Sequence, residues 1–295
     1  YKFLFYWLSI EAKKHVYSGM GNPKLMSHQV EKIPVPIPSP ENPKKSLEIQ
    51  AEIVRILDTF TELTTELTTE LTARKKQYNY YRDQLLSFEE GEVEWKTLGE
   101  VAKIQRGASP RPIAKYITDD EYGVPWIKIG DTSSGSKYVN KTAQKMTAEG
   151  AKKSRQLKRG DFILSNSMSF GRPYILDING AIHDGWAAIS DFGEYLNPDY
   201  LYHYLSSNNV QNYWLTKINS GSVSNLNADL IKTLKVPLPS LEEQARIVAI
   251  LDKFDTLTSS ITEGLPREIA LRQQQYEYYR DLLLSFPKPD TEVAA

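Results

Sequence analysis

The chain has 295 residues, of which 40% are apolar and 25% are charged, values typical of a globular protein with a sizeable core. It contains no cysteine, which excludes disulfides, thiolate zinc sites and a cysteine nucleophile, and suits a reducing cytoplasm. The net charge of −1 excludes a uniformly polybasic nucleic-acid binder, although residues 92–239 hold 18 Lys and Arg against 15 Asp and Glu.

The first ten residues are apolar and aromatic (YKFLFYWLSI). A membrane span needs about 20 such residues, and no basic leader or cleavage site accompanies the run. A similar aromatic run, residues 200–206, lies well inside the chain. We therefore expect both runs to be core helices of a cytoplasmic protein.

An internal repeat organises the chain. Residues 50–60 (QAEIVRILDTF) are echoed by 244–254 (QARIVAILDKF), and 77–88 (QYNYYRDQLLSF) by 275–286 (QYEYYRDLLLSF). Upstream, residues 35–38 (VPIP) match 236–239 (VPLP), where proline should end an irregular domain before a long helix. A period of about 200 residues is too long for a solenoid. It indicates two versions of one unit that face a target with two related halves.

The first copy predicts a long helix over residues 46–86. Its apolar positions share one face by i, i+3, i+4 spacing, and they are Ile53, Ile56, Leu57, Phe60, Leu63, Leu67 and Leu71. Residues 61–72 are three copies of Thr-Glu-Leu-Thr. A four-residue repeat overshoots the 3.6-residue turn, so its leucine stripe should drift around the helix. Because threonine is a poor helix former, this stretch should need a partner helix.

The second copy predicts a helix over residues 241–284, interrupted near Glu263 by Gly264 and Pro266. The two helices should pack antiparallel as a rod. Phe60 and Gln77 lie 17 residues apart, whereas Phe254 and Gln275 lie 21 apart. The difference of four residues is one Thr-Glu-Leu-Thr unit, which suggests a molecular ruler.

The predicted fold class is α+β, with β-rich domains joined by two long antiparallel helices. Strands are expected over 125–129, 162–165, 173–176 and 186–190, followed by one or two helices over 198–217. The expected divisions are a C-terminal remnant of a first domain (1–42), a spacer helix (43–88), a complete second domain (89–240), a second spacer helix (241–286) and a tail (287–295). The repeat predicts that about 100 residues of the first domain would precede Tyr1.

Two variable domains, each followed by a long helix ending in QYxYYRDxLLSF, resemble the specificity subunit of type I restriction-modification systems. The Thr-Glu-Leu-Thr array and residues 91–100 (GEVEWKTLGE) are similar to the type IC subfamily. The resemblance covers essentially the whole chain and departs from the family pattern in the truncated first domain. A dimer that supplies the complete domain twice would restore a two-part target by symmetry.

The resemblance implies a non-catalytic subunit that reads half-sites of a split double-stranded DNA target, with the helices setting their spacing. Its partners would be two methyltransferase subunits and the restriction-motor subunits. This chain would hold no cofactor, whereas the partner subunits would use S-adenosylmethionine, ATP and Mg. The alternative is a coiled-coil structural adaptor with no DNA specificity.

Three polar loops are the candidate DNA-binding segments, because small hydroxyls, amides and Arg suit phosphates and base edges. One of them, residues 106–112, should be flexible at Gly107 and stiffened by two prolines. The candidate residues are Arg106, Ser109, Arg111, Lys128, Ser165, Asn166, Ser167, Ser169, Arg172, Ser220, Ser222, Ser224 and Asn225. The alternative is that these are ordinary solvated loops.

A basic cluster and a turn are weaker candidates. Lys152, Lys153, Arg155, Lys158 and Arg159 could form a solvated helix face or provide nonspecific phosphate contact. Asp184 and Trp186 could support a base-reading loop, with core packing favoured for Trp186.

The helix ends predict a docking surface for the methyltransferase subunits, since amphipathic aromatic residues suit interfaces. The candidates are Tyr78, Tyr81 and Arg82 in the first copy and Tyr276, Tyr279 and Arg280 in the second. The alternative for the tyrosines is core packing against the adjacent domain.

No enzymatic constellation is apparent. Residues 197–200 (NPDY) resemble the Asn-Pro-Pro-Tyr motif of adenine methyltransferases, but Asp replaces the second proline and no glycine-rich loop follows a strand. The four histidines, His15, His28, His183 and His203, are scattered without metal-ligand spacing. We expect neither catalysis nor a metal site in this chain.

Overall fold

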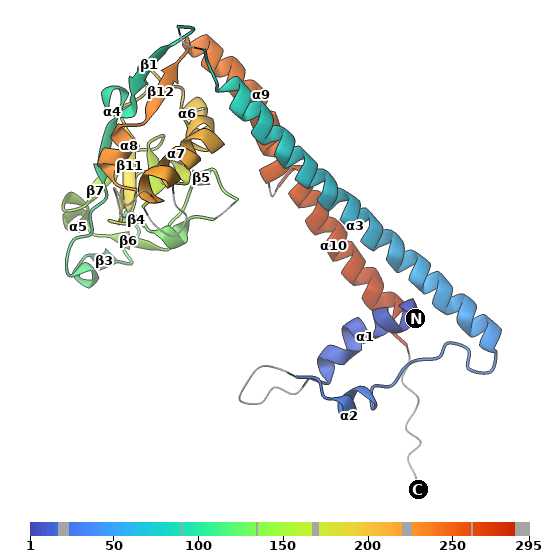
Figure 1. The fold of residues 1–295 in the computed structure, drawn as a ribbon. Helices are drawn as coiled ribbons and strands as arrows, with labels where there is room; N and C mark the ends of the chain where they lie inside the picture. The colour runs from blue at the N-terminus through green and yellow to red at the C-terminus, as the bar shows by residue number, and fades with distance from the viewer. Residues whose placement is uncertain are drawn as a thin grey trace. The chain divides into compact units, whose positions relative to one another are not determined.

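The computed structural model describes residues 1–16, 24–89, 91–133, 135–166, 171–219, 226–260 and 262–286 (Figure 1). The chain divides into two compact units, Tyr1–Leu71 with Leu265–Ala295, and Thr72–Gly264. We call them unit 1 and unit 2. None of the helices in the described part of the chain is long and apolar enough to span a membrane.

Unit 1 is helical. It contains α1 (Lys2–Lys14), α2 (Ser27–Val30), the first part of α3 (Pro43–Leu85) and nearly all of α10 (Gly264–Leu283). Its apolar core is formed by Phe3, Tyr6, Ile53, Leu57 and Leu284. Leu57 is fully buried, because it lies on the face predicted by the helical spacing. The predicted helices over the first ten residues and over 46–86 are confirmed.

Threonine hydroxyls of the Thr-Glu-Leu-Thr repeats form hydrogen bonds within their own helix. Thr64, Thr65, Thr68 and Thr69 each donate a hydroxyl hydrogen bond of 2.7–2.9 Å to the carbonyl four residues earlier. Such bonds need no partner across the helix pair. The short side chains leave a groove of about 350 Å³ along this stretch, bordered on α10 by Gln273 and Tyr276. The repeat is therefore a self-contained and loosely packed insert.

Unit 2 contains the β-rich domain. Its strands are β1 (Glu94–Thr97), β2 (Lys103–Arg106), β3 (Ile117–Thr118), β4 (Val124–Ile127), β5 (Tyr138–Val139), β6 (Gln144–Met146), β7 (Arg155–Leu157), β8 (Phe162–Ser165), β9 (Pro173–Leu176), β10 (Gly180–Ile182), β11 (Trp186–Ser190) and β12 (Lys235–Leu238). In the described residues they form one five-stranded sheet of order β3-β6-β4-β10-β7, a second of order β2-β11-β8-β9-β5, and the pair β1-β12.

Helices of unit 2 pack on both sheets. The helices of this unit are α4 (Leu98–Val101), η1 (Ile113–Lys115), η2 (Ile129–Asp131), α5 (Ala148–Lys152), α6 (Pro198–Leu205), α7 (Asn208–Asn219), α8 (Ala228–Lys232) and α9 (Leu241–Ser259), with the end of α3. α5 packs against β7 of the first sheet, and α4, α6 and α8 pack against β2 and β9 of the second. Side chains of β8, β11, α6, α8 and α9 share one apolar cluster. The predicted strands at 162–165, 173–176 and 186–190 and the helices after Pro198 are confirmed, and the predicted strand at 125–129 is β4.

The second spacer helix is interrupted as predicted. α9 ends at Ser259 and α10 begins at Gly264. Gly264 has a φ of 77°, and a Cβ there would lie 2.4 Å from the carbonyl oxygen of Thr256. Only glycine accepts this geometry without strain, so the interruption is encoded by that residue.

Both units use the same aromatic contact. In unit 1 Phe60 of α3 stacks on Tyr279 of α10, with ring centroids 5.4 Å apart. In unit 2 Phe254 of α9 stacks on Tyr81 of α3, with centroids 5.6 Å apart. Phe254 is the repeat counterpart of Phe60, and Tyr81 that of Tyr279. The duplicated sequence therefore forms a duplicated helix-pair contact, antiparallel in each unit (Figure 1).

Candidate nucleic-acid interface

Two loops far apart in sequence meet at the turn of residues 183–185. Strands β4 and β10 are parallel and end together, with Ile127 beside Ile182. The next residues, Lys128 and His183, therefore leave the sheet at the same edge, and the His183 amide donates to the Ile127 carbonyl at 3.1 Å. β2 ends at the same turn, because Arg106 pairs with Ala187 of β11.

Gly107 lets these segments approach closely. Its amide donates to the Trp186 carbonyl at 2.8 Å, and a Cβ at this position would lie 2.1 Å from the His183 carbonyl oxygen. The sequence suggested a flexible position, but Gly107 is buried and hydrogen-bonded. Glycine is needed here because two backbones touch, not because the loop must bend.

Asp184 is the centre of the edge. Its carboxylate Oδ1 accepts a hydrogen bond from the Ser109 hydroxyl at 2.9 Å and lies 3.1 Å from His183 Nε2. Its Oδ2 lies 3.8 Å from Arg111 Nη2. Its main-chain carbonyl accepts from Arg106 Nε at 3.2 Å, with the Asn166 amide at 3.5 Å. We call these residues the Asp184 cluster: Arg106, Ser109, Arg111, Asn166, His183 and Asp184.

The Asp184 cluster is strongly polar and largely accessible. Burial alone would raise the pKa of Asp184, but the Ser109 hydrogen bond and the neighbouring cations outweigh it and hold this pKa below its usual range. Arg111 is 85% exposed, so its guanidinium is available to a ligand. Arg155 is paired with Ile182 across β7 and β10, which places a further cation beside the turn. Such an edge suits a polyanion.

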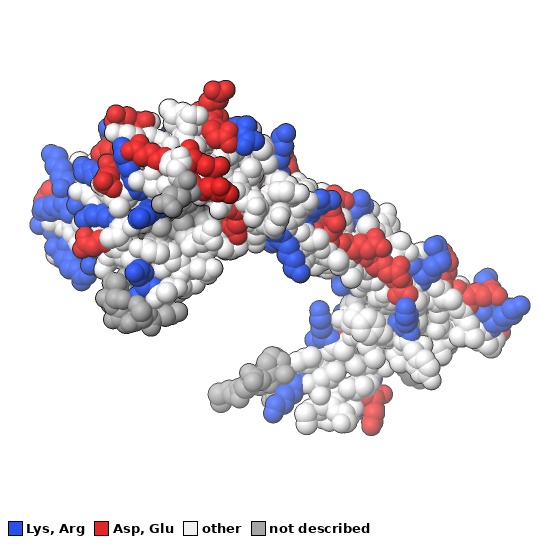
Figure 2. All heavy atoms as spheres, turned by 45° about the horizontal axis from the view of Figure 1, so that its top comes forward, with Lys and Arg blue, Asp and Glu red and all other residues white. Residues whose placement is uncertain are grey.

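The predicted basic segment adjoins this edge. Ser154 donates to the carbonyls of Ala108 and Ile182 at 2.6 and 3.2 Å, which fixes the segment against the Arg106 loop. Figure 2 shows Lys and Arg side chains gathered at the end of unit 2 that carries α5 and β7. Lys153 is paired with Glu149 and Arg159 with Asp177, both at 2.7 Å. Part of the cluster is therefore neutralised by local ion pairs.

The other candidate residues have different positions. Ser165 is fully buried at the end of β8, and the Arg172 guanidinium lies over the Tyr174 ring at 5.6 Å. Lys128 donates to Gln144 Oε1 at 2.8 Å. Trp186 is fully buried, so the core-packing alternative holds for it. The remaining candidates lie outside the described residues: Ser167, Ser169, Ser220, Ser222, Ser224 and Asn225.

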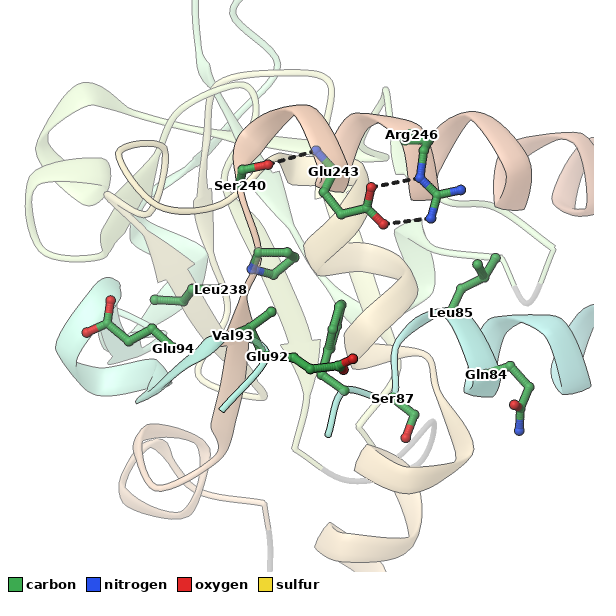
Figure 3. A pocket seen from close by; sticks show the side chains of 12 residues that line it. Gln84, Leu85, Ser87, Glu92, Val93, Glu94, Leu238, Ser240, Glu243 and Arg246 are labelled. Atoms are coloured by element: carbon green, nitrogen blue, oxygen red, sulfur yellow. Dashed lines mark hydrogen bonds and ion pairs between the residues drawn. The ribbon is translucent and has the colours of Figure 1, made fainter. Parts of the chain in front are cut away.

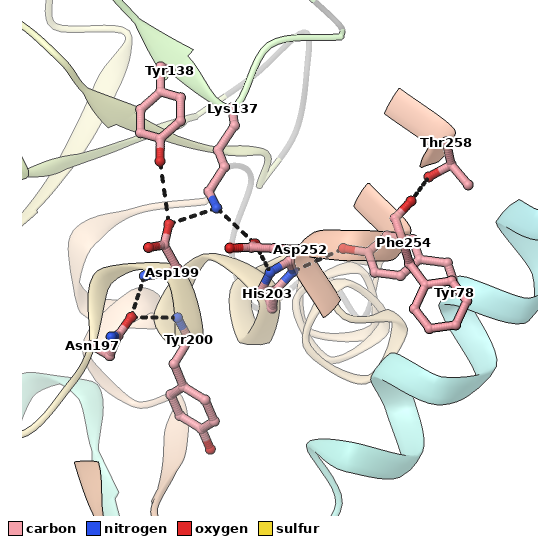
Figure 4. A network of polar contacts seen from close by, with 10 residues as sticks. All are labelled: Tyr78, Lys137, Tyr138, Asn197, Asp199, Tyr200, His203, Asp252, Phe254 and Thr258. Carbon is pink, nitrogen blue, oxygen red and sulfur yellow. Dashed lines mark hydrogen bonds and ion pairs between the residues drawn. The ribbon is translucent and has the colours of Figure 1, made fainter. Parts of the chain in front are cut away.

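A partly buried polar network fixes the β-rich domain to the helices of unit 2 (Figure 4). Asp252 of α9 binds His203 Nε2 of α6 at 2.8 Å and Lys137 Nζ at 3.3 Å. Lys137 also binds Asp199 at 2.7 Å. The other ring nitrogen of fully buried His203 contacts the Tyr78 hydroxyl of α3 at 2.9 Å. We call Tyr78, Lys137, Asp199, His203 and Asp252 the Asp252 network.

The charges of the Asp252 network shift pKa values in opposite directions. Burial would raise the pKa of Asp252, but the hydrogen bond from His203 and the charge of Lys137 outweigh it and lower this pKa. Burial would lower the pKa of Lys137, but the hydrogen bond and charge of Asp199 raise it instead. Because a carboxylate only accepts, His203 Nε2 donates the hydrogen bond to Asp252.

Unit 1 repeats this arrangement with different residues. Asp58, the counterpart of Asp252, accepts from the Tyr6 hydroxyl and from Lys2 Nζ, both at 2.7 Å. Aligned along the aromatic run, Tyr6 stands where unit 2 has His203. Each spacer helix therefore holds its neighbouring segment through an aspartate at the same place in the repeat.

The predicted docking residues differ in exposure. Tyr78 and Arg82 are buried, at 7% and 5% exposure, and the Arg82 guanidinium lies over the Tyr78 ring. Tyr81 and Tyr279 are 41% and 37% exposed despite their stacking. Tyr276 and Arg280 are half-buried, with the guanidinium 5.6 Å from the ring centroid. The exposed tyrosines are therefore the ones that a partner could contact.

A groove of about 620 Å³ lies where α3 ends and α9 begins (Figure 3). Its charged lining is mainly acidic, with Glu92, Glu94 and Glu243. Its arginine, Arg246, is held by Glu243 through two hydrogen bonds of 2.6 and 2.7 Å. Such a lining does not suit a polyanion, so the groove is not part of the candidate interface.

No group of three or more His, Cys, Asp or Glu side chains in the described residues is arranged to hold a metal ion. His203, which is buried, and His183 are the histidines with described roles in unit 2, and each binds an aspartate. These contacts orient loops and helices.

The fold and the Asp184 cluster define a class: a β-rich reading domain with a basic edge, carried by helices that recur within the chain. Comparisons with known proteins agree. The family model for the type I restriction modification DNA specificity domain matches residues 1–75 and 90–271. The chain therefore belongs to this family of type I DNA specificity subunits, and its role is DNA-sequence recognition.

The relatives cover nearly all of the chain. It is 45% identical to the type I restriction enzyme EcoR124I/EcoR124II specificity subunit of Escherichia coli, covering 98% of this chain and 72% of that protein. It is 37% identical to a putative type I restriction enzyme specificity subunit of Haemophilus influenzae, in an alignment that covers 97% of this chain and 72% of that protein. A solved structure of a type I R-M system matches with a TM-score of 0.70 at 18% identity, covering 96% and 70%, and shows the same fold.

Sequence reasoning named Asp184 as a possible support for a base-reading loop, but it did not identify this residue as the centre of the edge. It singled out the arginine and serine loops by composition, but the residue on which they converge is one aspartate between His183 and Gly185. The available signal was Gly107 opposite a Gly-containing turn, since glycine in a strand often marks close backbone approach.

Proposed function

We propose that unit 2 reads one half of a split double-stranded DNA target through the edge that carries the Asp184 cluster. The observation that supports this most is the convergence of Arg106, Arg111 and Asn166 on one turn from loops distant in sequence. Arg and Asn are the side chains that read guanine and adenine edges by paired hydrogen bonds. Lys128, Arg155 and the neighbouring basic segment would contact phosphates and fix the register.

The proposed domains have the boundaries that the sequence predicts. Residues 1–42 correspond to the end of a first recognition domain, 43–88 and 241–286 to the spacer helices, 89–240 to the complete second domain and 287–295 to a tail. The helices would set the distance between the half-sites. A second copy of the chain, or a complete first domain, would supply the other half-site.

The proposed partners dock on the helices and carry the chemistry. Exposed Tyr81 and Tyr279 occupy repeat-related positions, so two methyltransferase subunits could bind equivalent surfaces. Restriction-motor subunits would join that complex in the cytoplasm. The chain itself would be non-catalytic and hold no cofactor, while the partner subunits would use S-adenosylmethionine, ATP and Mg.

The proposal is tested with the chain co-expressed with its methyltransferase subunit, by sequencing the adenines methylated in a randomised duplex library. Replacing both Arg106 and Arg111 by alanine should abolish the selected motif and weaken binding about 10²-fold, as each bidentate contact contributes about 1–3 kcal/mol. Co-purification of the methyltransferase should persist. A matched control is Lys115→Ala with Lys141→Ala, which removes two exposed cations outside the Asp184 cluster.

The same experiment separates the rival function. An unchanged methylation motif in the double arginine variant would show that this edge does not read DNA sequence. Absence of any motif in the wild type, with normal co-purification, would favour a structural adaptor. Arg172→Ala tests the candidate loop of residues 165–172: we expect weaker DNA binding with methyltransferase docking intact.

A further inference from the structure

The negative charge of the Asp184 carboxylate is unfavourable on a surface that binds DNA. A negative charge repels phosphates, so a DNA-reading edge contains a carboxylate at a cost. Two roles could offset this cost. The carboxylate could accept a hydrogen bond from a base amino group, or it could hold the cations that contact DNA.

The contacts of the carboxylate favour the second role. Oδ1 is already engaged by the Ser109 hydroxyl at 2.9 Å and by His183 Nε2 at 3.1 Å. Oδ2 faces the Arg111 guanidinium at 3.8 Å. The Asp184 side chain is 30% exposed, against 85% for Arg111, so the arginine is the more accessible member of the pair.

The main chain of Asp184 completes the arrangement. Its carbonyl accepts from Arg106 Nε at 3.2 Å, and its amide donates to the Ser109 hydroxyl oxygen at 3.2 Å. Ser109 therefore joins the side chain and the backbone of Asp184. Displacing the carboxylate would loosen the turn that orients Arg106 as well as the ion pair that orients Arg111.

We propose that Asp184 is the positioning residue of the DNA-reading edge, holding Arg106 and Arg111 in the orientation in which they contact DNA. The inference rests on the proposed function and adds a residue that does not itself touch bases. Arginine loses rotamer freedom when it forms a bidentate contact. An arginine ordered in advance loses less on binding and so binds its site more tightly.

The test is a double-mutant cycle on the full chain purified with its methyltransferase subunit. The variants are Asp184→Asn, Arg111→Ala and the combination, with Asp119→Asn as the matched control for loss of one carboxylate. Asp119 is exposed on the same domain and is not part of the Asp184 cluster. Binding is measured to a duplex carrying the motif selected by the wild type and to a scrambled duplex of the same composition.

We expect Asp184→Asn to weaken binding to the selected duplex about tenfold, the loss typical of one charge-assisted contact. Binding to the scrambled duplex should stay unchanged or tighten, because a repulsive charge is removed. The combined variant should lose less than the sum of the two single losses, since residues acting through one another are not additive. Asp119→Asn should not change the ratio of the two affinities.

Three results would overturn the proposal. The first is that the binding losses of the two single variants add in the combined variant, and the second is that Asp184→Asn behaves like the control. The third is a changed preference at one base pair without coupling to Arg111, which would mean that Asp184 itself contacts the base. If Asp184→Asn unfolds at a lower temperature than the wild type, Asp184→Glu is used instead. The glutamate keeps the negative charge, so this variant should retain most of the wild-type selectivity between the two duplexes. Failure of the proposed function is distinct, since Arg106→Ala with Arg111→Ala would then leave the motif unchanged.

Discussion

At the scale of single residues, two aspartates of unit 2 have different tasks. Asp184 lies at the domain edge and contacts side chains that reach solvent. Asp252 lies between the domain and the helices and binds buried His203 and Lys137. Desolvation offsets much of the attraction within such charged pairs, so their presence is weak evidence for net stability and fits a role in fixing the arrangement. We therefore regard the Asp252 network as the element that fixes how the reading domain is held on α9.

The Asp252 network predicts a pH dependence of the stability of unit 2. The lowered pKa of Asp252 means a stabilising contribution that is present above its unfolded pKa of about 3.9 and is lost as pH falls through the folded pKa. The raised pKa of Lys137 means a contribution that is complete below about 10.4 and is lost as pH rises through its folded pKa.

The measurement is urea unfolding of the wild type and Asp252→Asn across this pH range. The variant should have a lower midpoint between these limits, and the two midpoints should converge in acid, where the wild-type carboxyl is protonated. Asp119→Asn, an exposed carboxylate, is the control. A constant difference at all pH values would contradict the role assigned to the carboxylate charge.

At the scale of elements, the two spacer helices are not equivalent. α3 is continuous over 43 residues, whereas its counterpart is divided into α9 and α10. The division occurs at Gly264, whose positive φ and close approach to Thr256 exclude a side chain. The helix with the repeated Thr-Glu-Leu-Thr array is the one that runs without interruption.

Gly264→Ala should destabilise the junction by about 1–3 kcal/mol, the cost of a side chain held in an unfavourable backbone region. Thermal and urea unfolding would measure it. Gly193→Ala is the control, because no atom lies within 4 Å of a Cβ built there and its φ is ordinary. Equal effects of the two substitutions would show that the junction imposes no such requirement.

At the scale of the whole molecule, the length of the spacer helix α3 can change in steps of one Thr-Glu-Leu-Thr unit. Four threonines of the array donate their hydroxyls to carbonyls of their own helix, so these bonds do not depend on the partner helix. Four helical residues correspond to about 6 Å at 1.5 Å per residue. One base pair of DNA rises about 3.4 Å.

Deleting residues 65–68 should therefore shorten the preferred gap between half-sites by one or two base pairs while leaving the recognised bases unchanged. Sequencing of methylated library DNA would show the shift. A matched control replaces Glu66 by glutamine, which alters the array without changing its length. A changed half-site sequence, or an unchanged gap, would contradict the ruler function of the helix.

Elements with local sequence patterns could be predicted before the structure was known. The helical face around Leu57, the strands at 162–165 and 173–176, and the interruption at Gly264 follow from spacing, β-propensity and glycine chemistry, and the structure has each of them. The repeat also indicated the duplicated unit, since similar sequences in similar surroundings form similar contacts.

Only the tertiary structure decided which polar residues meet. The Asp184 cluster is assembled by strand order, because β2, β8, β10 and β11 bring residues 106–111, 166 and 184 to one edge. The burial of Tyr78 and the exposure of Tyr81 were likewise undecided by a motif in which both are tyrosines. Local patterns fix helices and strands, whereas contacts between distant residues depend on the register and packing of the completed sheets.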